Sequence, residues 1–271
     1  MTYDWISFTT DYGIDDGFVG ACEGVIARIS PATRVLHVSH TVPAQDVRRG
    51  ANILAQTAPY LPTAVHLAVV DPGVGTDRRG IVVVAAEGLL VGPDNGLLVP
   101  AAELLGGVRA AFELAEPAYQ LSTVSATFHG RDVFAPAAAH LAAGVAPENF
   151  GAAVDVTALV RLPEPETVVE AGKLTSEILS IDSFGNIQLA ATGADLDAAG
   201  GYAGSGVHAN LAGRSVTAVV GQTFGEVGIE GTIVYVDSAG RVALAVNGGS
   251  AAVEFGATLG DQVRLLFARP Q

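Results

Sequence analysis

The strongest constraint on the fold is a change of pattern near residue 161. Before that point, short apolar runs typical of buried strands alternate with segments whose apolar residues have helical spacing. The runs lie at 5–10, 33–39, 64–71, 80–86 and 88–92; the helical segments begin at Phe18 and cover 46–58 and 132–144, with Asp132 near the cap of the last. Strands that alternate with helices predict an α/β domain in which a largely parallel sheet is flanked by helices.

A second pattern follows the stretch RLPEPETV at 161–168, which is rich in proline and glutamate. From residue 173 onward the sequence shows short strand-like runs and turns, and IVYVD–SAG–RVALAV has the form of a β-hairpin. We therefore predict an α/β domain over 1–163, a linker over 164–172, and a small all-β, barrel-like domain over 173–271.

The composition excludes several classes of protein. The 271 residues carry a formal net charge of −14, whereas binding to nucleic acid requires clustered lysine and arginine. The one cysteine, Cys22, excludes a disulfide within the chain and a cysteine-based zinc site, and we expect it in the core. No apolar run reaches the roughly 20 residues that cross a bilayer. The first residues lack the pattern of a secretory leader, so we expect a cytoplasmic protein.

Two polar segments follow predicted strands, namely TTDYGIDD at 9–16 and VVDPGVGTDRRG at 69–80. Ligands of open parallel sheets bind beyond the carboxyl ends of the strands, which makes both segments candidates for a site. The second segment lacks the lysine and the spacing of a P-loop. Taken alone, it is explained more simply as a glycine-rich turn whose arginines pair with Asp71 or Asp77.

A histidine in FHGRD, at 128–132, is a third candidate. His129 precedes Gly130 at the entry to a predicted helix. A lone histidine is more often a packed or solvated residue than a catalyst. The six histidines show no metal-ligand spacing, so nothing favours a metal site of Asp16, Asp71 and His129, although the sequence alone leaves it open.

Two further segments are GPDNG at 92–96, a turn signal, and IDSFGN at 181–186. The second is explained by a turn, but it would also suit a nucleoside. The Asp182 carboxylate accepts from hydroxyls, the Phe184 ring stacks on a base, and the Asn186 amide pairs with a base edge.

Seven segments in this order resemble the S-adenosyl-L-methionine (SAM) hydroxide adenosyltransferase family, which is related to the fluorinating and chlorinating SAM enzymes. They are FTTDYGIDDGFVG, HTVPAQDVRRGA, VDPGVGTDRRGI, GPDNGLL, TFHGRDVFAPAAAHLAAG, IDSFGNIQL and SAGRVALAVNGGSA, and the resemblance runs from about residue 5 to 267. It implies an N-terminal α/β domain and a C-terminal β-barrel-like domain. It also implies a homotrimer, with SAM held where one subunit's N-terminal domain meets a neighbour's C-terminal domain.

The resemblance implies hydrolysis of SAM to adenosine and L-methionine, by attack of a water-derived hydroxide on ribose C5′. It assigns the catalytic set to Asp71, Arg78 and His129, positions that hold other residues in the halogenating relatives. Arg78 would supply positive charge, Asp71 would orient Arg78 or accept from water, and His129 is favoured as the base because Arg78 opposes its protonation. No metal and no cofactor are expected.

The resemblance also assigns binding roles. Asp11 would hold the ribose hydroxyls, Asp16 and Asp182 the methionine amino group, and Ser238 the methionine carboxylate. The adenine pocket would be formed by Phe184, Asn186, Phe224 and the backbone of Asn247 and Gly248. Two other hypotheses stay open, a halide-using SAM adenosyltransferase and a non-catalytic SAM or nucleoside binder.

Overall fold

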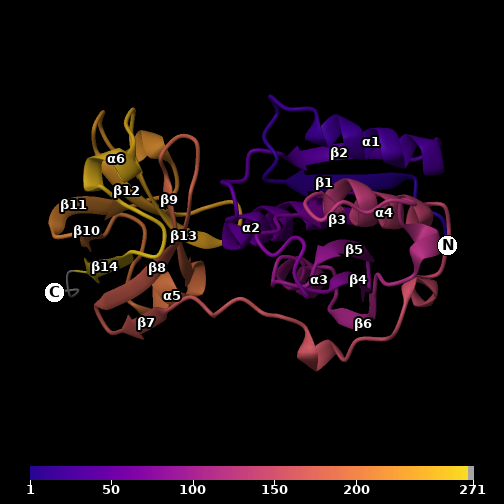
Figure 1. The fold of residues 1–271 in the computed structure, drawn as a ribbon. Coiled ribbons are helices and arrows are strands. Elements are labelled where there is room, and N and C mark those ends of the chain that lie inside the picture. The colour runs from indigo at the N-terminus through magenta and orange to yellow at the C-terminus, as the bar shows by residue number, and fades with distance from the viewer. Residues whose placement is uncertain (268–271) are drawn as a thin grey trace. The chain divides into compact units, whose positions relative to one another are not determined.

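The computed structural model describes residues 1–267 (Figure 1). The chain divides into two compact units, Met1–Leu162 and a second that begins at Pro163. We describe each unit by itself.

The first unit contains a six-stranded sheet in the order β2-β1-β3-β5-β4-β6. Its strands are β1 (Trp5–Thr10), β2 (Arg34–Ser39), β3 (Ala64–Val69), β4 (Gly80–Ala85), β5 (Gly88–Pro93) and β6 (Val108–Glu113). Strands β2, β1, β3 and β5 pair in parallel, and β4 pairs antiparallel with both β5 and β6. The prediction of a largely parallel sheet is confirmed.

Helices cover both faces of this sheet. They are α1 (Phe18–Ile29), α2 (Val47–Thr57), α3 (Val99–Leu104) and α4 (Ala135–Ala142). Side chains alternate along a strand, so Val65, Leu67 and Val69 of β3 pack with α1 and α4, while Ala68 packs in the cluster that contains α2 and α3. Cys22 is buried in α1, as its apolar surroundings predicted.

The helix predicted over 132–144 begins differently from the prediction. A π-helical turn, η3 (Gly130–Phe134), precedes α4. Asp132 does not cap α4; it is fully buried in the π-helical turn, accepts a hydrogen bond from the Ser125 backbone N–H at 2.8 Å and pairs with Arg131. Local contacts explain the difference, because the preceding loop at Ser125 and the adjacent Arg131 supply the donors that the Asp132 carboxylate binds.

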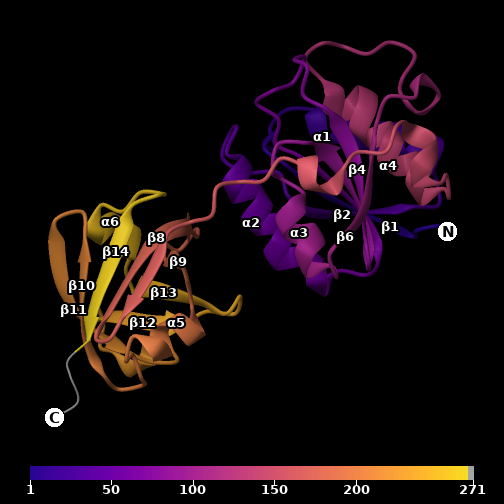
Figure 2. The same ribbon diagram turned by 90° about the horizontal axis from the view of Figure 1, so that it is seen from below.

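The second unit is a seven-stranded barrel, closed by pairing of β14 with β8, and its strands curve around a common core (Figure 2). The barrel strands are β8 (Lys173–Ile181), β9 (Ile187–Thr192), β10 (Gly206–Leu211), β11 (Arg214–Val220), β12 (Thr232–Val236), β13 (Arg241–Val246) and β14 (Gln262–Phe267). The predicted hairpin is β12–β13. The all-β, barrel-like prediction is confirmed, with short helices α5 (Gly193–Ala198) and α6 (Ala251–Phe255) added. Strand β7 (Thr167–Glu170) pairs with β8 and lies within the stretch expected as a linker.

Short 3-10 turns complete the described elements: η1 (Ala58–Tyr60), η2 (Pro117–Tyr119), η4 (Pro147–Phe150), η5 (Val156–Ala158) and η6 (Phe224–Glu226). Over residues 1–267, the structure contains no helix with the length and apolar character needed to cross a membrane.

A buried histidine in β3 makes the stability of the first unit depend on pH. His66 is 1% exposed, its Nδ1 shares a 2.8 Å hydrogen bond with the Ser7 hydroxyl, and burial lowers its pKa to about 4. The unfolded chain, with a histidine pKa near 6.5, therefore binds the proton more readily than the folded chain. Stability conferred by neutral His66 is present above pH 6.5 and is lost as pH falls toward 4, by up to about 3 kcal/mol.

We expect His66→Gln to flatten this dependence, because glutamine stays neutral and keeps an acceptor for Ser7. Urea unfolding followed by the fluorescence of Trp5, the single tryptophan of the chain, reports on the sheet that contains His66. Equal losses of stability between pH 7 and pH 4.5 in parent and variant would contradict the assignment.

Candidate active site

The loop between β3 and β4 carries a largely buried ion pair. Arg78 Nε donates to Asp71 Oδ1 at 2.9 Å and Arg78 Nη2 donates to Asp71 Oδ2 at 2.5 Å, so the contact is bidentate. The Asp71 side chain is 6% exposed and the Arg78 side chain 13%. Burial and the two parallel bonds give this pair a fixed geometry that a surface ion pair lacks.

Glycines allow the loop to approach its neighbours. Gly75 has φ +77°, and a Cβ there would lie 2.4 Å from the Ala126 carbonyl oxygen. The close approach places the β3–β4 loop against the segment that leads to His129. The glycine-rich segment is therefore more than a surface turn.

His129 joins the pair from the start of the π-helical turn. Its Nδ1 lies 3.0 Å from Arg78 Nη2. A guanidinium has donors and no acceptor, so Nδ1 must accept, and the hydrogen of the neutral imidazole is on Nε2. The pKa of His129 is lowered, first by burial and then by the charge of Arg78, while Asp71 and Asp132 act in the opposite direction.

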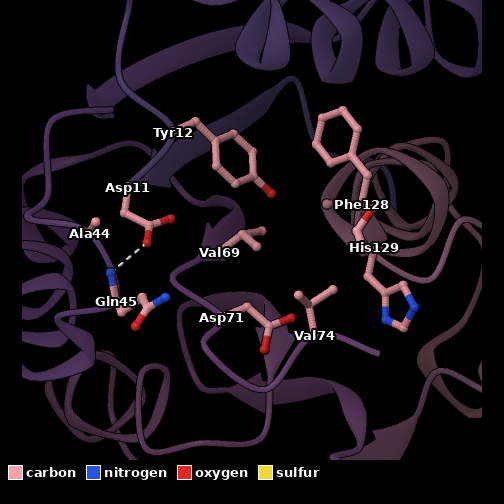
Figure 3. Close-up of a pocket in the computed structure, with 11 residues that line it drawn as sticks. Asp11, Tyr12, Ala44, Gln45, Val69, Asp71, Val74, Phe128 and His129 are labelled. Atoms are coloured by element: carbon pink, nitrogen blue, oxygen red, sulfur yellow. Dashed lines mark hydrogen bonds between the residues drawn. The ribbon is translucent and has the colours of Figure 1, made fainter. Parts of the chain in front are cut away.

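Asp71 and His129 line one pocket with Asp11, at the ends of β1 and β3 (Figure 3). The pocket has a volume of about 230 Å³ and is lined by Asp11, Tyr12, Ala44, Gln45, Val69, Asp71, Val74, Thr127, Phe128, His129 and Gly130. Asp11 Oδ2 accepts a hydrogen bond from the Gln45 backbone N–H at 2.8 Å. Asp16 lies farther along the exposed loop before α1 and is not among the lining residues.

Sequence reasoning missed two aromatic members of this pocket. Tyr12 and Phe128 directly neighbour the predicted residues Asp11 and His129, which was the available signal. Their rings pack edge to face at 5.7 Å, and both pack on Phe18.

A hydrogen-bonded chain behind Asp11 was also missed. The Thr10 hydroxyl bonds to His40 at 2.9 Å, His40 bonds to His37 at 2.7 Å, and His37 bonds to Glu23 at 2.9 Å. Burial lowers the pKa of His40 to about 4, and the neighbouring His37 acts in the same direction. The Thr10 hydroxyl also accepts from the Tyr12 backbone N–H, so the chain helps to hold the end of β1.

The neighbouring arginine has a different task. Arg79 pairs with buried Asp94 and donates to the Ala158 carbonyl, and Asp94 also accepts from the Val160 backbone N–H. Asn95 donates to the Val70 carbonyl at 2.9 Å. The GPDNG turn therefore fastens the β3–β4 loop to the rest of the unit.

The second unit presents another group of predicted residues. Asp182 accepts from the backbone N–H groups of Phe184 and Asn186, both at 2.9 Å, and from the Asn186 side-chain amide at 2.7 Å. These bonds close the β8–β9 turn and leave the Phe184 ring 77% exposed. The predicted turn is therefore present, and it displays an aromatic ring.

The remaining predicted residues lie on other loops of this unit. Asn247 donates to the Val227 carbonyl, Gly248 follows with φ +77°, and Phe224 packs on Tyr235. Asn247 follows the end of β13 that pairs with Thr232, whereas Ser238 lies in the turn at the opposite end of the β12–β13 hairpin. The fold of this unit alone does not bring Ser238 next to Asn247.

The donors of the first unit do not form a ready metal centre. In the part of the chain that the structure describes, no three or more histidine, cysteine, aspartate or glutamate side chains are grouped to hold a metal ion. Asp16 does not line the pocket that Asp71 and His129 share, and both of the latter bind Arg78.

Comparison with known proteins identifies the family. Residues 6–151 match the SAM hydroxide adenosyltransferase N-terminal domain, and residues 176–264 match the C-terminal domain of the same family. This chain belongs to the SAM hydroxide adenosyltransferase family.

Individual relatives agree with the family match. The chain is 56% identical over 261 residues to a protein of Salinispora tropica named (R)-S-adenosyl-L-methionine hydrolase, covering 96% of this chain and 97% of the relative. It is 28% identical over 271 residues to a fluorinase of an Actinoplanes species, covering 89% of this chain and 90% of that protein. A crystal structure of an uncharacterized conserved protein from Thermotoga maritima has a TM-score of 0.90 and 33% identity, covering 96% of this chain and 99% of that one.

The Arg78–His129 contact can be tested in solution. We expect Arg78→Met to raise the pKa of His129, because the substitution removes a positive charge that opposes protonation. NMR titration of the histidine ring signals measures this, with the His129 signal assigned from a His129→Gln variant. Arg79→Met, which removes the adjacent arginine that binds Asp94, is the matched control and should leave the pKa of His129 unchanged. Equal effects of the two substitutions would contradict the contact.

Proposed function

We propose that this protein hydrolyses SAM to adenosine and L-methionine by attack of a water-derived hydroxide on ribose C5′. The observation that carries the proposal is the largely buried Asp71–Arg78 pair, joined to His129 beside a pocket in a member of this family. The name of the Salinispora tropica relative supports the same reaction.

The leaving group needs no assistance from the protein in this reaction, whereas the water nucleophile must be activated. The C5′–oxygen bond forms as the C5′–sulfur bond breaks, and the bonding electrons leave with methionine as a neutral thioether. The sulfonium is a good leaving group, so no general acid is required. Water, with a pKa near 15.7, needs a hydrogen-bond acceptor for its proton and positive charge or donors that stabilise the developing hydroxide.

The hydrogen-bond pattern favours different roles for the three residues. Arg78 has no acceptor and contributes charge. The lone pair of His129 at Nδ1 is engaged by Arg78, so the neutral ring has no free lone pair to accept the water proton. Each Asp71 oxygen binds Arg78 once and keeps a second lone pair. We therefore propose Asp71 as the acceptor of the water proton, rather than His129 as the sequence favoured.

The same donor set supports a reaction without a metal. Both Asp71 oxygens and His129 Nδ1 already bind the Arg78 cation, whose positive charge would repel a metal ion at these atoms. We expect chelation with EDTA to leave turnover unchanged.

The deciding experiment separates the products. Purified protein incubated with SAM in chloride buffer should release equal amounts of adenosine and methionine. Formation of 5′-chloro-5′-deoxyadenosine without adenosine would instead favour the halide-using reaction. SAM binding without any product would favour a non-catalytic binder.

We expect Arg78→Lys to lower kcat about 100- to 1000-fold while SAM still binds, because lysine keeps the charge but loses the planar fork that holds Asp71 and His129. Single-turnover rates and equilibrium binding of SAM measure the two effects separately. Arg79→Lys is the matched control and should retain turnover. Unchanged kcat in Arg78→Lys would remove Arg78 from the reaction.

We also propose a homotrimer in which the N-terminal unit of one subunit and the C-terminal unit of a neighbour share each SAM molecule. Asp11 would hold the ribose and Asp16 the methionine amino group. The other unit would contribute Asp182, Phe184, Asn186, Phe224, Ser238, Asn247 and Gly248 to adenine and methionine. The exposure of Phe184 supports this proposal, because an exposed aromatic ring on that unit is available to pack against a ligand.

Mixing two inactive variants tests the shared site. Asp71→Asn and Phe184→Ala subunits, each inactive or impaired alone, should regain hydrolysis when they are unfolded, mixed and refolded together. In such mixed trimers, some sites combine an intact N-terminal unit with an intact C-terminal unit. Activity that never exceeds the sum of the separate variants would contradict the arrangement, and sedimentation velocity would report the oligomeric state.

A further inference from the structure

Tyr12 directs a hydroxyl group into the active-site pocket from the end of β1 (Figure 3). Its ring packs edge to face on Phe18 at 6.1 Å and on Phe128 at 5.7 Å, two rings that also pack on each other, and its backbone N–H donates to Thr10. These contacts hold the ring, and with it the hydroxyl, in place.

The hydroxyl occupies the space that a side chain at position 130 would need. A Cβ added to Gly130 would lie 1.8 Å from the Tyr12 hydroxyl oxygen and 2.9 Å from Tyr12 Cζ. Gly130 begins the π-helical turn and does not have a positive φ, so its backbone conformation does not require glycine. Glycine in a helix costs about 1 kcal/mol relative to alanine. The close contact with Tyr12 is therefore the physical reason for glycine at this position.

The hydroxyl has hydrogen-bonding capacity that the protein leaves unused. Among residues 1–267, no group makes a hydrogen bond with it. Burial raises the pKa of Tyr12, and the nearby carboxylates of Asp11 and Asp71 act in the same direction, so the phenol keeps its proton. The hydroxyl lines the pocket and is therefore free to donate to a polar atom of the pocket contents.

We propose that the Tyr12 hydroxyl donates a hydrogen bond to the oxygen of the attacking water and is a further catalytic residue, with Gly130 required to make room for it. The inference rests on the proposed hydrolysis. Tyr12 lines the same pocket as Asp71 and His129, so its hydroxyl adds a neutral donor to the groups around the nucleophile.

The donated bond would act in two ways. It would occupy one lone pair of the water oxygen and leave the other directed at C5′. It would also strengthen as hydroxide character develops, because a donor stabilises growing negative charge more than a neutral oxygen. Tyr12 keeps its proton throughout, and the water proton passes to Asp71. The balance of the reaction is unchanged.

Removal of the hydroxyl alone tests the role. We expect Tyr12→Phe, which keeps the packed ring, to lower kcat about 10- to 100-fold and to change the equilibrium Kd for SAM less than twofold. Tyr60→Phe is the matched control, because Tyr60 is 81% exposed on η1 and lies outside the pocket. It should retain the parent kcat.

The outcomes separate this inference from the proposed function. If the parent protein releases no adenosine from SAM, the proposed hydrolysis fails, and this role fails with it. If the parent is active and Tyr12→Phe has unchanged kcat, the catalytic role of Tyr12 is wrong. Weaker SAM binding with unchanged kcat would show instead that the hydroxyl binds substrate.

A second pair of variants tests the steric half of the proposal without relying on activity. Gly130→Ala should lower the melting temperature by several degrees, whereas Gly20→Ala in α1, where an added Cβ meets no atom within 4 Å, should leave it unchanged or raise it. In a Tyr12→Leu background, Gly130→Ala should lose most of its effect, because the shorter side chain vacates the contested space. Equal effects of Gly130→Ala in both backgrounds would contradict the contact.

Discussion

The bidentate contact between Asp71 and Arg78 is the interaction on which the rest of the site depends. The fork of Arg78 engages both oxygens of Asp71 and still directs Nη2 at His129. Because a guanidinium only donates, the bond from Arg78 to His129 Nδ1 also decides that the imidazole hydrogen is on Nε2. Both charges are largely buried, so each neutralises the other, and removal of one partner would leave the other uncompensated.

The fold holds this contact in place because the two adjacent arginines bind different partners. Arg78 binds Asp71 and His129, whereas Arg79 binds Asp94 and the Ala158 carbonyl. One arginine thus serves the pocket while its neighbour ties the same loop to the scaffold. Such anchoring keeps a loop residue precise enough to align a nucleophile with C5′, where misplacement by about 1 Å is costly.

Much of the fold was predictable because the pattern of apolar residues changes once along the chain. Before that change, strand-like and helix-like segments alternate; after it, the pattern is that of strands alone. Elements without a clear period were missed. Helix α3 has six residues and is largely apolar, so no polar face marks it as a helix. Asp132 looked like a cap because aspartate favours that position, yet its carboxylate binds the Ser125 N–H of the preceding loop and the adjacent Arg131 instead. The site is harder still, since Arg78 and His129 are far apart in sequence, and the family resemblance rather than any local pattern joined them.

Tyr12 and Gly130 show what single-residue reasoning leaves out. An aromatic residue at the end of a buried strand is explained by packing, and a glycine at a helix entry is explained by flexibility. The contact between Tyr12 and Gly130 contradicts both explanations. Gly130 has no positive φ, and the Tyr12 hydroxyl occupies the space that a Cβ at position 130 would need. A helical glycine carries the cost of its missing side chain to make room for a hydroxyl that faces the pocket, and packing alone would not retain this arrangement. The requirement lies in what the pocket binds, and it becomes visible only when the two residues are considered together.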